Sequence, residues 1–184
     1  MSDTWRADEL YLKVKGDMKY LFALMDDETR FWIAQEVADT KDKHDARRLF
    51  QMGKEAAGKK PTKLITDGLY AYRDAFRKEF YSYRGVRVEH IHSVAIRGDR
   101  NNNKMERLNG EIRDREKVVR GVKKKDTPIL AGYQIYHNYL RPHEALGGRT
   151  PAQAAGIEVK GENKWLTLIQ NASRKKGHKS TSGI

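Results

Sequence analysis

Three successive segments with the alternating pattern of β-strands occupy the N-terminal part of the chain. Apolar and polar side chains alternate from Thr4 to Val14, and the alternation resumes from Lys19 to Met25 after a break at Gly16-Asp17. Turn-forming residues at positions 26–29 separate the second segment from a third, Arg30–Ala38, which is rich in aromatic and β-branched residues. Because strands joined by short turns pair antiparallel, we expect three antiparallel strands here.

The following part of the chain alternates between helical and strand patterns. The predicted segments are a helix that Thr40 or Asp42 caps and Gly58 ends, a strand at Lys63–Thr66, a helix at Tyr72–Phe80, a strand at Val86–Ile91, a long helix through Met105–Val119 and a helix from Thr127. A strand–helix–strand unit favours parallel pairing. The sequence therefore predicts an α/β fold with a mixed five-stranded sheet and helices on both of its faces.

The chain is strongly basic. It contains 37 Lys and Arg against 25 Asp and Glu, a formal net charge of +12, which predicts a polyanionic partner. Charged residues make up 34% of the sequence, and no apolar run approaches the ~20 residues that span a bilayer, so a membrane protein is excluded. The sequence has no cysteine and no apolar signal segment at its start, so we expect a cytoplasmic, intracellular protein.

Three acidic residues stand at positions where chemistry is possible. Asp8 is an acid in an otherwise apolar strand, although an edge strand wetted on one side would explain it as well. Asp67 ends a strand that is predicted to be buried, where α/β sheets gather ligands, but Asp-Gly is equally common as a turn that caps a helix. Glu106 lies on the polar face of the long helix, where a solvated acid is also common.

Together the three acids form a stronger pattern than each alone. Carboxylate oxygens are the ligands that Mg²⁺ and Mn²⁺ prefer. Two such ions held about 3.5–4 Å apart can activate a nucleophile and stabilise the leaving oxygen in phosphodiester cleavage. If the fold brings the three carboxylates together, they would repel one another without a cation. The metal-free site should then bind cations or raise the pKa of one of these acids.

The segments around these acids resemble the DDE transposase and retroviral-integrase superfamily, most closely the prokaryotic insertion-sequence transposases. The resemblance rests on Trp5-Arg6-Ala7-Asp8-Glu9, Thr66-Asp67-Gly68 and the segment Asn102–Asn109 with Glu106, on the 38 residues between Asp67 and Glu106, on Arg113 seven residues after Glu106, and on Arg141-Pro142-His143-Glu144-Ala145-Leu146 followed by Thr150-Pro151-Ala152. It covers roughly Trp5 to Ile157. It implies an RNase H-like fold in which Asp8, Asp67 and Glu106 are the catalytic residues and ligate Mg²⁺ or Mn²⁺.

The resemblance also implies an activity and partners. The expected function is metal-dependent DNA cleavage and strand transfer in transposition, with transposon ends and target DNA as partners, a homo-oligomeric synaptic complex and association with the nucleoid. We expect a catalytic core at residues 1–157, a C-terminal extension at 158–172 and a basic, disordered tail at 173–184. Such transposases usually carry an N-terminal DNA-recognition region, and here the first catalytic strand begins within five residues of Met1.

A basic segment follows the third acid. The residues expected to contact DNA phosphates are Arg113, Arg115, Lys117, Arg120, Lys123, Lys124 and Lys125. A solvated basic helix and turn would explain about half of them equally well.

Two questions stay open at the level of sequence. A catalytically idle DNA-binding relic and an RNase H-like nuclease remain alternatives to a transposase. The third acid is assigned to Glu106 rather than Glu111 because the two lie about 140° apart around the helix.

Overall fold

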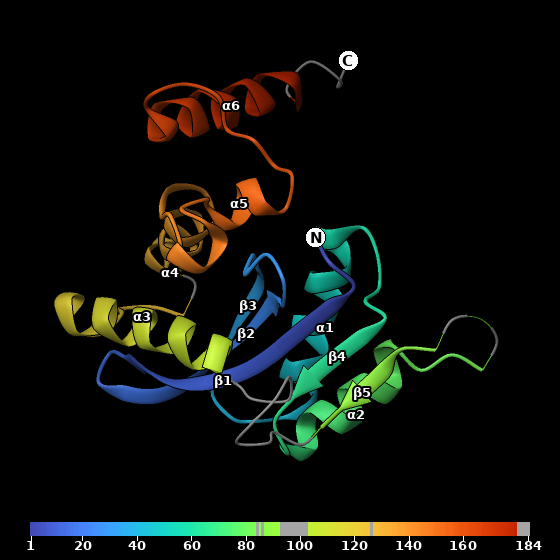
Figure 1. Cartoon of the computed structure of the whole chain (residues 1–184). Coiled ribbons are helices and arrows are strands. Elements are labelled where there is room, and N and C mark those ends of the chain that lie inside the picture. The colour runs from blue at the N-terminus through green and yellow to red at the C-terminus, as the bar shows by residue number, and fades with distance from the viewer. Residues whose placement is uncertain (84, 86, 93–102, 126, 180–184) are drawn as a thin grey trace.

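The computed structural model describes residues 1–83, 85, 87–92, 103–125 and 127–179, with side chains as far as Arg174. One sheet with the strand order β3-β2-β1-β4-β5 lies at its centre (Figure 1). The strands are β1 (Thr4–Val14), β2 (Asp17–Asp26), β3 (Trp32–Ala38), β4 (Lys63–Thr66) and β5 (Glu89–Ile91). The first three pair antiparallel, whereas β1, β4 and β5 run parallel, which confirms the predicted mixed sheet.

Two strands begin later than the sequence predicts. β3 begins at Trp32 rather than Arg30, because Arg30 has a φ of 58° and cannot continue a strand. β5 begins at Glu89 rather than Val86, and residue 86 lies outside the described residues.

Helices cover both faces of the sheet. On one face, α1 (Lys43–Ala57) and α2 (Tyr70–Glu79) pack against the odd-numbered positions Trp5 and Ala7 of β1. On the other face, α3 (Asn103–Val119) and α4 (Pro128–Ile135) pack against even-numbered positions such as Leu10 and Leu12. The period of two along β1 thus assigns Asp8 to the α3 side of the sheet.

The boundaries of α1 follow from its capping residues. The side chain of Asp42 accepts a hydrogen bond from the backbone N–H of His44 at 2.8 Å, and Gly58 ends the helix with a φ of 65°. Gly53 allows α1 to lie directly against β2, since a Cβ at this position would meet Cδ2 of Leu24 at 2.2 Å.

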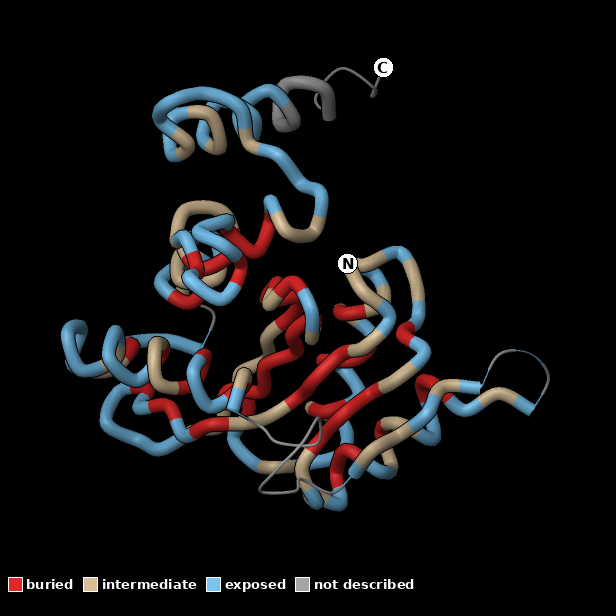
Figure 2. The backbone as a smooth tube through the Cα atoms, viewed as in Figure 1, coloured by how far each residue is buried: buried red, intermediate tan, exposed pale blue. Residues whose placement is uncertain are grey.

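The C-terminal elements continue from α4. A π-helix, η1 (Tyr136–Leu140), follows it directly, and then come the 3-10 helix η2 (Glu144–Leu146), α5 (Pro151–Ala154) and α6 (Lys164–Lys179). Figure 2 shows α6 as largely exposed and apart from the sheet. No helix in the described part of the chain is long and apolar enough to cross a membrane.

The helix α6 differs from the expected tail. It crosses the boundary expected after residue 172, and its backbone is helical as far as Lys179, where disorder was expected from residue 173. Ala172, Arg174 and the lysines that follow favour helix intrinsically, so polar composition alone did not indicate disorder. Residues 180–184 lie outside the described residues.

Candidate catalytic site

The central pair of parallel strands brings Asp8 and Asp67 together. The register of β1 and β4 places Ala7 beside Thr66, and each acid is the next residue along its strand direction. One carboxylate oxygen each of Asp8, Asp67 and Glu9 lies within 4.8 Å of the others. We call these three residues the acid group.

The carboxylate of Asp8 lies between the sheet and α3. Its Oδ2 atom accepts a hydrogen bond from Nδ2 of Asn109 at 3.0 Å. Burial, and then the negative charges of Glu9 and Asp67, raise the pKa of Asp8 to about 6. The raised pKa was expected for crowded carboxylates, and a bound cation would relieve the repulsion.

Asp67 serves the local backbone as well as the acid group. Its Oδ1 atom accepts a hydrogen bond from the backbone N–H of Leu69 at 3.0 Å, just before α2 begins at Tyr70. Both uses weighed in the sequence are therefore present: Asp67 shapes the turn into α2, and it lies beside Asp8 at the end of β4.

Glu9 is the member of the acid group that the sequence did not single out. The pairing of β1 with β4 ends at Ala7 and Thr66. Beyond this point β4 no longer lies beside β1, so the side chain of Glu9 can approach Asp67. Its side chain is 4% exposed and forms an ion pair with Lys41 at 2.7 Å. Its Oε2 atom has no hydrogen-bond partner among the described residues.

The acid group fits a divalent cation. All three ligands are carboxylates, which suit Mg²⁺ and Mn²⁺. Burial, and then the neighbouring carboxylates, raise the pKa of Asp8, and a cation bound beside it would stabilise its charged form.

Glu106 lies in the first turn of α3 and is exposed. Within the described residues, no acidic cluster that could hold a metal includes it. It stands one helical turn before Asn109, which contacts Asp8, so the start of α3 is directed toward the acid group. Asn102, the first residue of the motif around Glu106, lies outside the described residues.

Glu111 is engaged elsewhere. Its Oε2 atom lies 3.0 Å from Nδ1 of His137 and 2.7 Å from a guanidinium nitrogen of Arg141. Burial acts to raise the pKa of Glu111, but the hydrogen bond to His137 and the nearby positive charges outweigh it and hold the pKa below its usual value. Glu111 therefore faces away from Asp8, in a network that the sequence did not reveal because its members come from different elements.

The predicted DNA-contacting residues lie on the last two turns of α3 and the segment that follows it. All seven are exposed: Arg113, Arg115, Lys117, Arg120, Lys123, Lys124 and Lys125. Lys117 pairs with Asp114, and Lys125 pairs with Asp39. The guanidinium of Arg115 lies 5.2 Å from the ring centre of Tyr136.

Comparison with solved structures relates the fold to integrase cores. The integrase catalytic core domain of HTLV-2 in complex with magnesium, in its trimeric form, superposes with a TM-score of 0.63 and 17% identity, over 84% of this chain and 97% of that one. Its dimeric form gives a TM-score of 0.61 at 14% identity, over 84% and 95% of the two chains. An intasome of simian T-cell lymphotropic virus in complex with the PP2A regulatory subunit B56 gamma gives a TM-score of 0.66 at 14% identity, over 86% of this chain and 56% of that one.

Comparison of sequences gives the family. No curated protein matches the chain. A family model described as a DDE domain, of the IS240 transposase type, matches residues 2–143, which is more than half of the chain. The chain thus belongs to the DDE-domain transposase family and has the RNase H-like fold of a transposase or integrase catalytic core.

Proposed function

We propose that this catalytic core cleaves phosphodiester bonds of DNA and transfers the resulting 3′ ends to target DNA, with divalent ions held at the acid group. The observation that supports it best is the adjacency of Asp8 and Asp67 on neighbouring parallel strands. The proposed catalytic core spans residues 1–157, and the extension (158–172) and basic tail (173–184) expected after it share the helix α6.

Asp8 and Asp67 would hold the metal. When bound, two Mg²⁺ or Mn²⁺ ions supply activation of the attacking water or DNA 3′-hydroxyl and stabilisation of the leaving oxygen. Asn109 orients the carboxylate of Asp8 through its 3.0 Å hydrogen bond. The positive charge of Lys41 balances the negative charge of Glu9 and so reduces the electrostatic repulsion among three adjacent, partly buried carboxylates.

Glu106 is proposed as the third catalytic carboxylate. It lies on the same helix as Asn109 and one turn before it, on the part of α3 that approaches Asp8. Arg113 lies seven residues after it, and this residue and the basic segment through Lys125 would contact DNA phosphates.

DNA ends and target DNA are the proposed partners, and a homo-oligomer is the proposed assembly. Dimeric and trimeric forms of a related integrase core, and an intasome, are among the similar structures. The net charge of +12 supports a nucleic-acid partner and hence association with the nucleoid.

Two carboxylate-to-amide substitutions test the role of Glu106. Glu106→Gln should lower Mn²⁺-dependent cleavage of supercoiled DNA by at least about 100-fold, because the ligand charge is lost while the helix is preserved. Glu55→Gln is the matched control, since Glu55 is an exposed acid on α1, on the opposite face of the sheet. Equal cleavage by the two variants would remove Glu106 from the site and direct attention to Glu9.

A further inference from the structure

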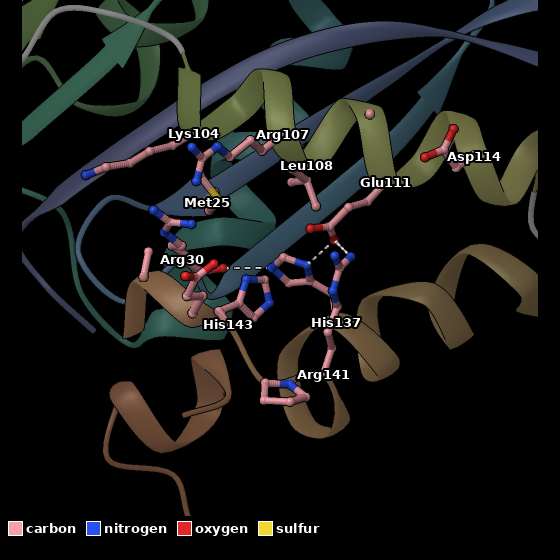
Figure 3. Close-up of a pocket in the computed structure, with 14 residues that line it drawn as sticks. Met25, Arg30, Lys104, Arg107, Leu108, Glu111, Asp114, His137, Arg141 and His143 are labelled. Atoms are coloured by element: carbon pink, nitrogen blue, oxygen red, sulfur yellow. Dashed lines mark hydrogen bonds and ion pairs between the residues drawn. The ribbon is translucent and has the colours of Figure 1, made fainter. Parts of the chain in front are cut away.

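A second pocket lies on the other side of α3 from the acid group. It has a volume of about 780 Å³ and is lined by α3, the turn between β2 and β3, and the segment from η1 to η2 (Figure 3). Asn109 points from α3 to Asp8, whereas Glu111, two residues later, lines this pocket. The two sites are therefore distinct and share one helix.

An arginine in an unfavourable backbone conformation lines the pocket. Arg30 has a φ of 58°, in the left-handed region that glycine adopts at no cost and other residues rarely adopt. Its backbone is fixed from two sides: its N–H donates to the carbonyl of Asp26 at 3.0 Å, and its carbonyl lies 2.9 Å from Nε2 of His137. The turn between β2 and β3 and the contact from η1 together hold this conformation, so the position of Arg30 beside the pocket is fixed by its backbone.

The pocket holds two arginines without acidic partners. Lys104 pairs with Asp27, and Arg141 pairs with Glu111. Arg30 and Arg107 form no ion pair with a carboxylate in the part of the chain that the structure describes. Both arginines line the same pocket. Burial, and then the charge of Arg107, lower the pKa of Arg30, and the carboxylates of Glu111 and Asp27 offset this only in part.

Two histidines, His137 and His143, line the same pocket as the arginines. The ring nitrogens of His137 face the carboxylate of Glu111 at 3.0 Å and the carbonyl of Arg30 at 2.9 Å. Both partners are hydrogen-bond acceptors, so the ring of His137 links the side chain of Glu111 on α3 to the backbone of Arg30. The ring of His143 lies 4.8 Å from that of His137, and its Nε2 atom has no hydrogen-bond partner within the described part of the chain. Burial, and then the neighbouring His137, lower the pKa of His143 to about 4, so it offers a neutral ring to the pocket.

The acids that line the pocket do not cancel this charge. Glu111 is already shared between His137 and Arg141. Asp114 and Glu144 are exposed, and Asp114 pairs with Lys117 at 3.4 Å. The inner part of the pocket therefore combines net positive charge with hydrogen-bond donors.

We propose that this pocket binds a phosphate group of a nucleic-acid backbone between the guanidinium groups of Arg30 and Arg107. Guanidinium groups match phosphate in shape and charge, and an anion between them removes their mutual repulsion. The inference rests on the proposed function, because that function makes DNA the partner. It adds a phosphate contact that is separate from the basic segment Arg113–Lys125.

The test uses Arg30→Gly in the full chain. Glycine suits a φ of 58°, so this variant removes the guanidinium without disturbing the turn. In fluorescence anisotropy with a labelled DNA duplex, Arg30→Gly and Arg107→Ala should each weaken binding about tenfold and reduce the slope of log affinity against log salt by about 1. Arg77→Ala is the charge-matched control, since Arg77 is exposed on α2 across the sheet, and it should bind like the wild type.

Other outcomes overturn the inference in distinguishable ways. If Arg30→Gly binds DNA as the wild type does, or no more weakly than Arg77→Ala, the pocket makes no contact with DNA. The proposed function is unaffected by that result, because it stands or falls with metal-dependent cleavage by the wild type. If inorganic phosphate shifts the NMR signals of the Arg30 and Arg107 side chains while Arg30→Gly leaves DNA binding intact, the pocket serves a small phosphate and the assignment to nucleic acid is wrong.

Discussion

The carboxylate of Asp8 is held where its negative charge is disfavoured. Burial and two neighbouring acids raise its pKa to about 6, and hydrogen bonds from the backbone of Glu9 and from Asn109 offset this only in part. A residue selected for stability alone would not be an acid at this place, since a neutral amide would keep the hydrogen bond and lose the repulsion. A partly buried carboxylate whose charged form is disfavoured without a cation is typical of a functional, cation-binding site.

Asp8→Asn should therefore stabilise the metal-free protein. The pKa of Asp8 is higher in the folded state than its ordinary value of 3.8, so its stabilising contribution is present at low pH and is lost as pH rises from about 4 to 6. At pH 7 the variant should be more stable than the wild type by about 1–3 kcal/mol in urea unfolding with a chelator present. Lower stability of the variant at pH 7 would contradict the assigned environment of Asp8.

Among the helices and strands, the sequence predicted the features that depend on local residue patterns. The alternation along β1 assigned Asp8 to one face and Glu9 to the other, and the capping residues defined α1. The membership of Glu9 in the acid group was not predictable, because it depends on where β4 ends beside β1. The left-handed backbone at Arg30 was missed for a similar reason, since contacts from Asp26 and from η1 impose it.

One long-range contact that no local pattern indicates joins η1 to the sheet. Asn138 is buried, and its side chain accepts from the backbone N–H of Trp32 at 2.8 Å and donates to the carbonyl of Trp32 at 2.9 Å. The Nε2 atom of Gln134 donates to the same carbonyl at 2.8 Å. The amide of Asn138 thus completes the hydrogen bonding of β3 and fixes the wall of the pocket that contains His137.

Asn138→Ala should lower the free energy of unfolding by about 1–3 kcal/mol, because the backbone of buried Trp32 loses its hydrogen bonds with the Asn138 amide. Chemical denaturation monitored by tryptophan fluorescence measures this directly. Asn171→Ala, at an exposed position on α6, should change the free energy of unfolding by less than about 0.5 kcal/mol. Similar values for both variants would show that η1 is not held by this contact.

At the scale of the whole molecule, α3 connects the features on which function is proposed to depend. Asn109, on one face of α3, contacts the acid group, and Glu106 lies in its first turn. The basic segment begins on its last two turns, and another face of the helix lines the pocket that contains Arg30. Lys104 pairs with Asp27 at its beginning, and the backbone of Val122 pairs with β1 just after its end. The proposed metal site, the proposed DNA contacts and the sheet are thereby linked through one helix.

The most direct test is metal-dependent cleavage by the wild type beside Asp67→Asn, on supercoiled and on 3′-recessed duplex DNA. Asp67→Asn keeps an oxygen for the hydrogen bond to the N–H of Leu69, so its fold should persist, and circular dichroism checks this. Cleavage in Mg²⁺ or Mn²⁺ that is lost in the variant, with DNA binding retained, is the predicted result. Equal cleavage by both proteins, or no cleavage by folded wild-type protein that binds DNA, would contradict a working site at Asp8 and Asp67.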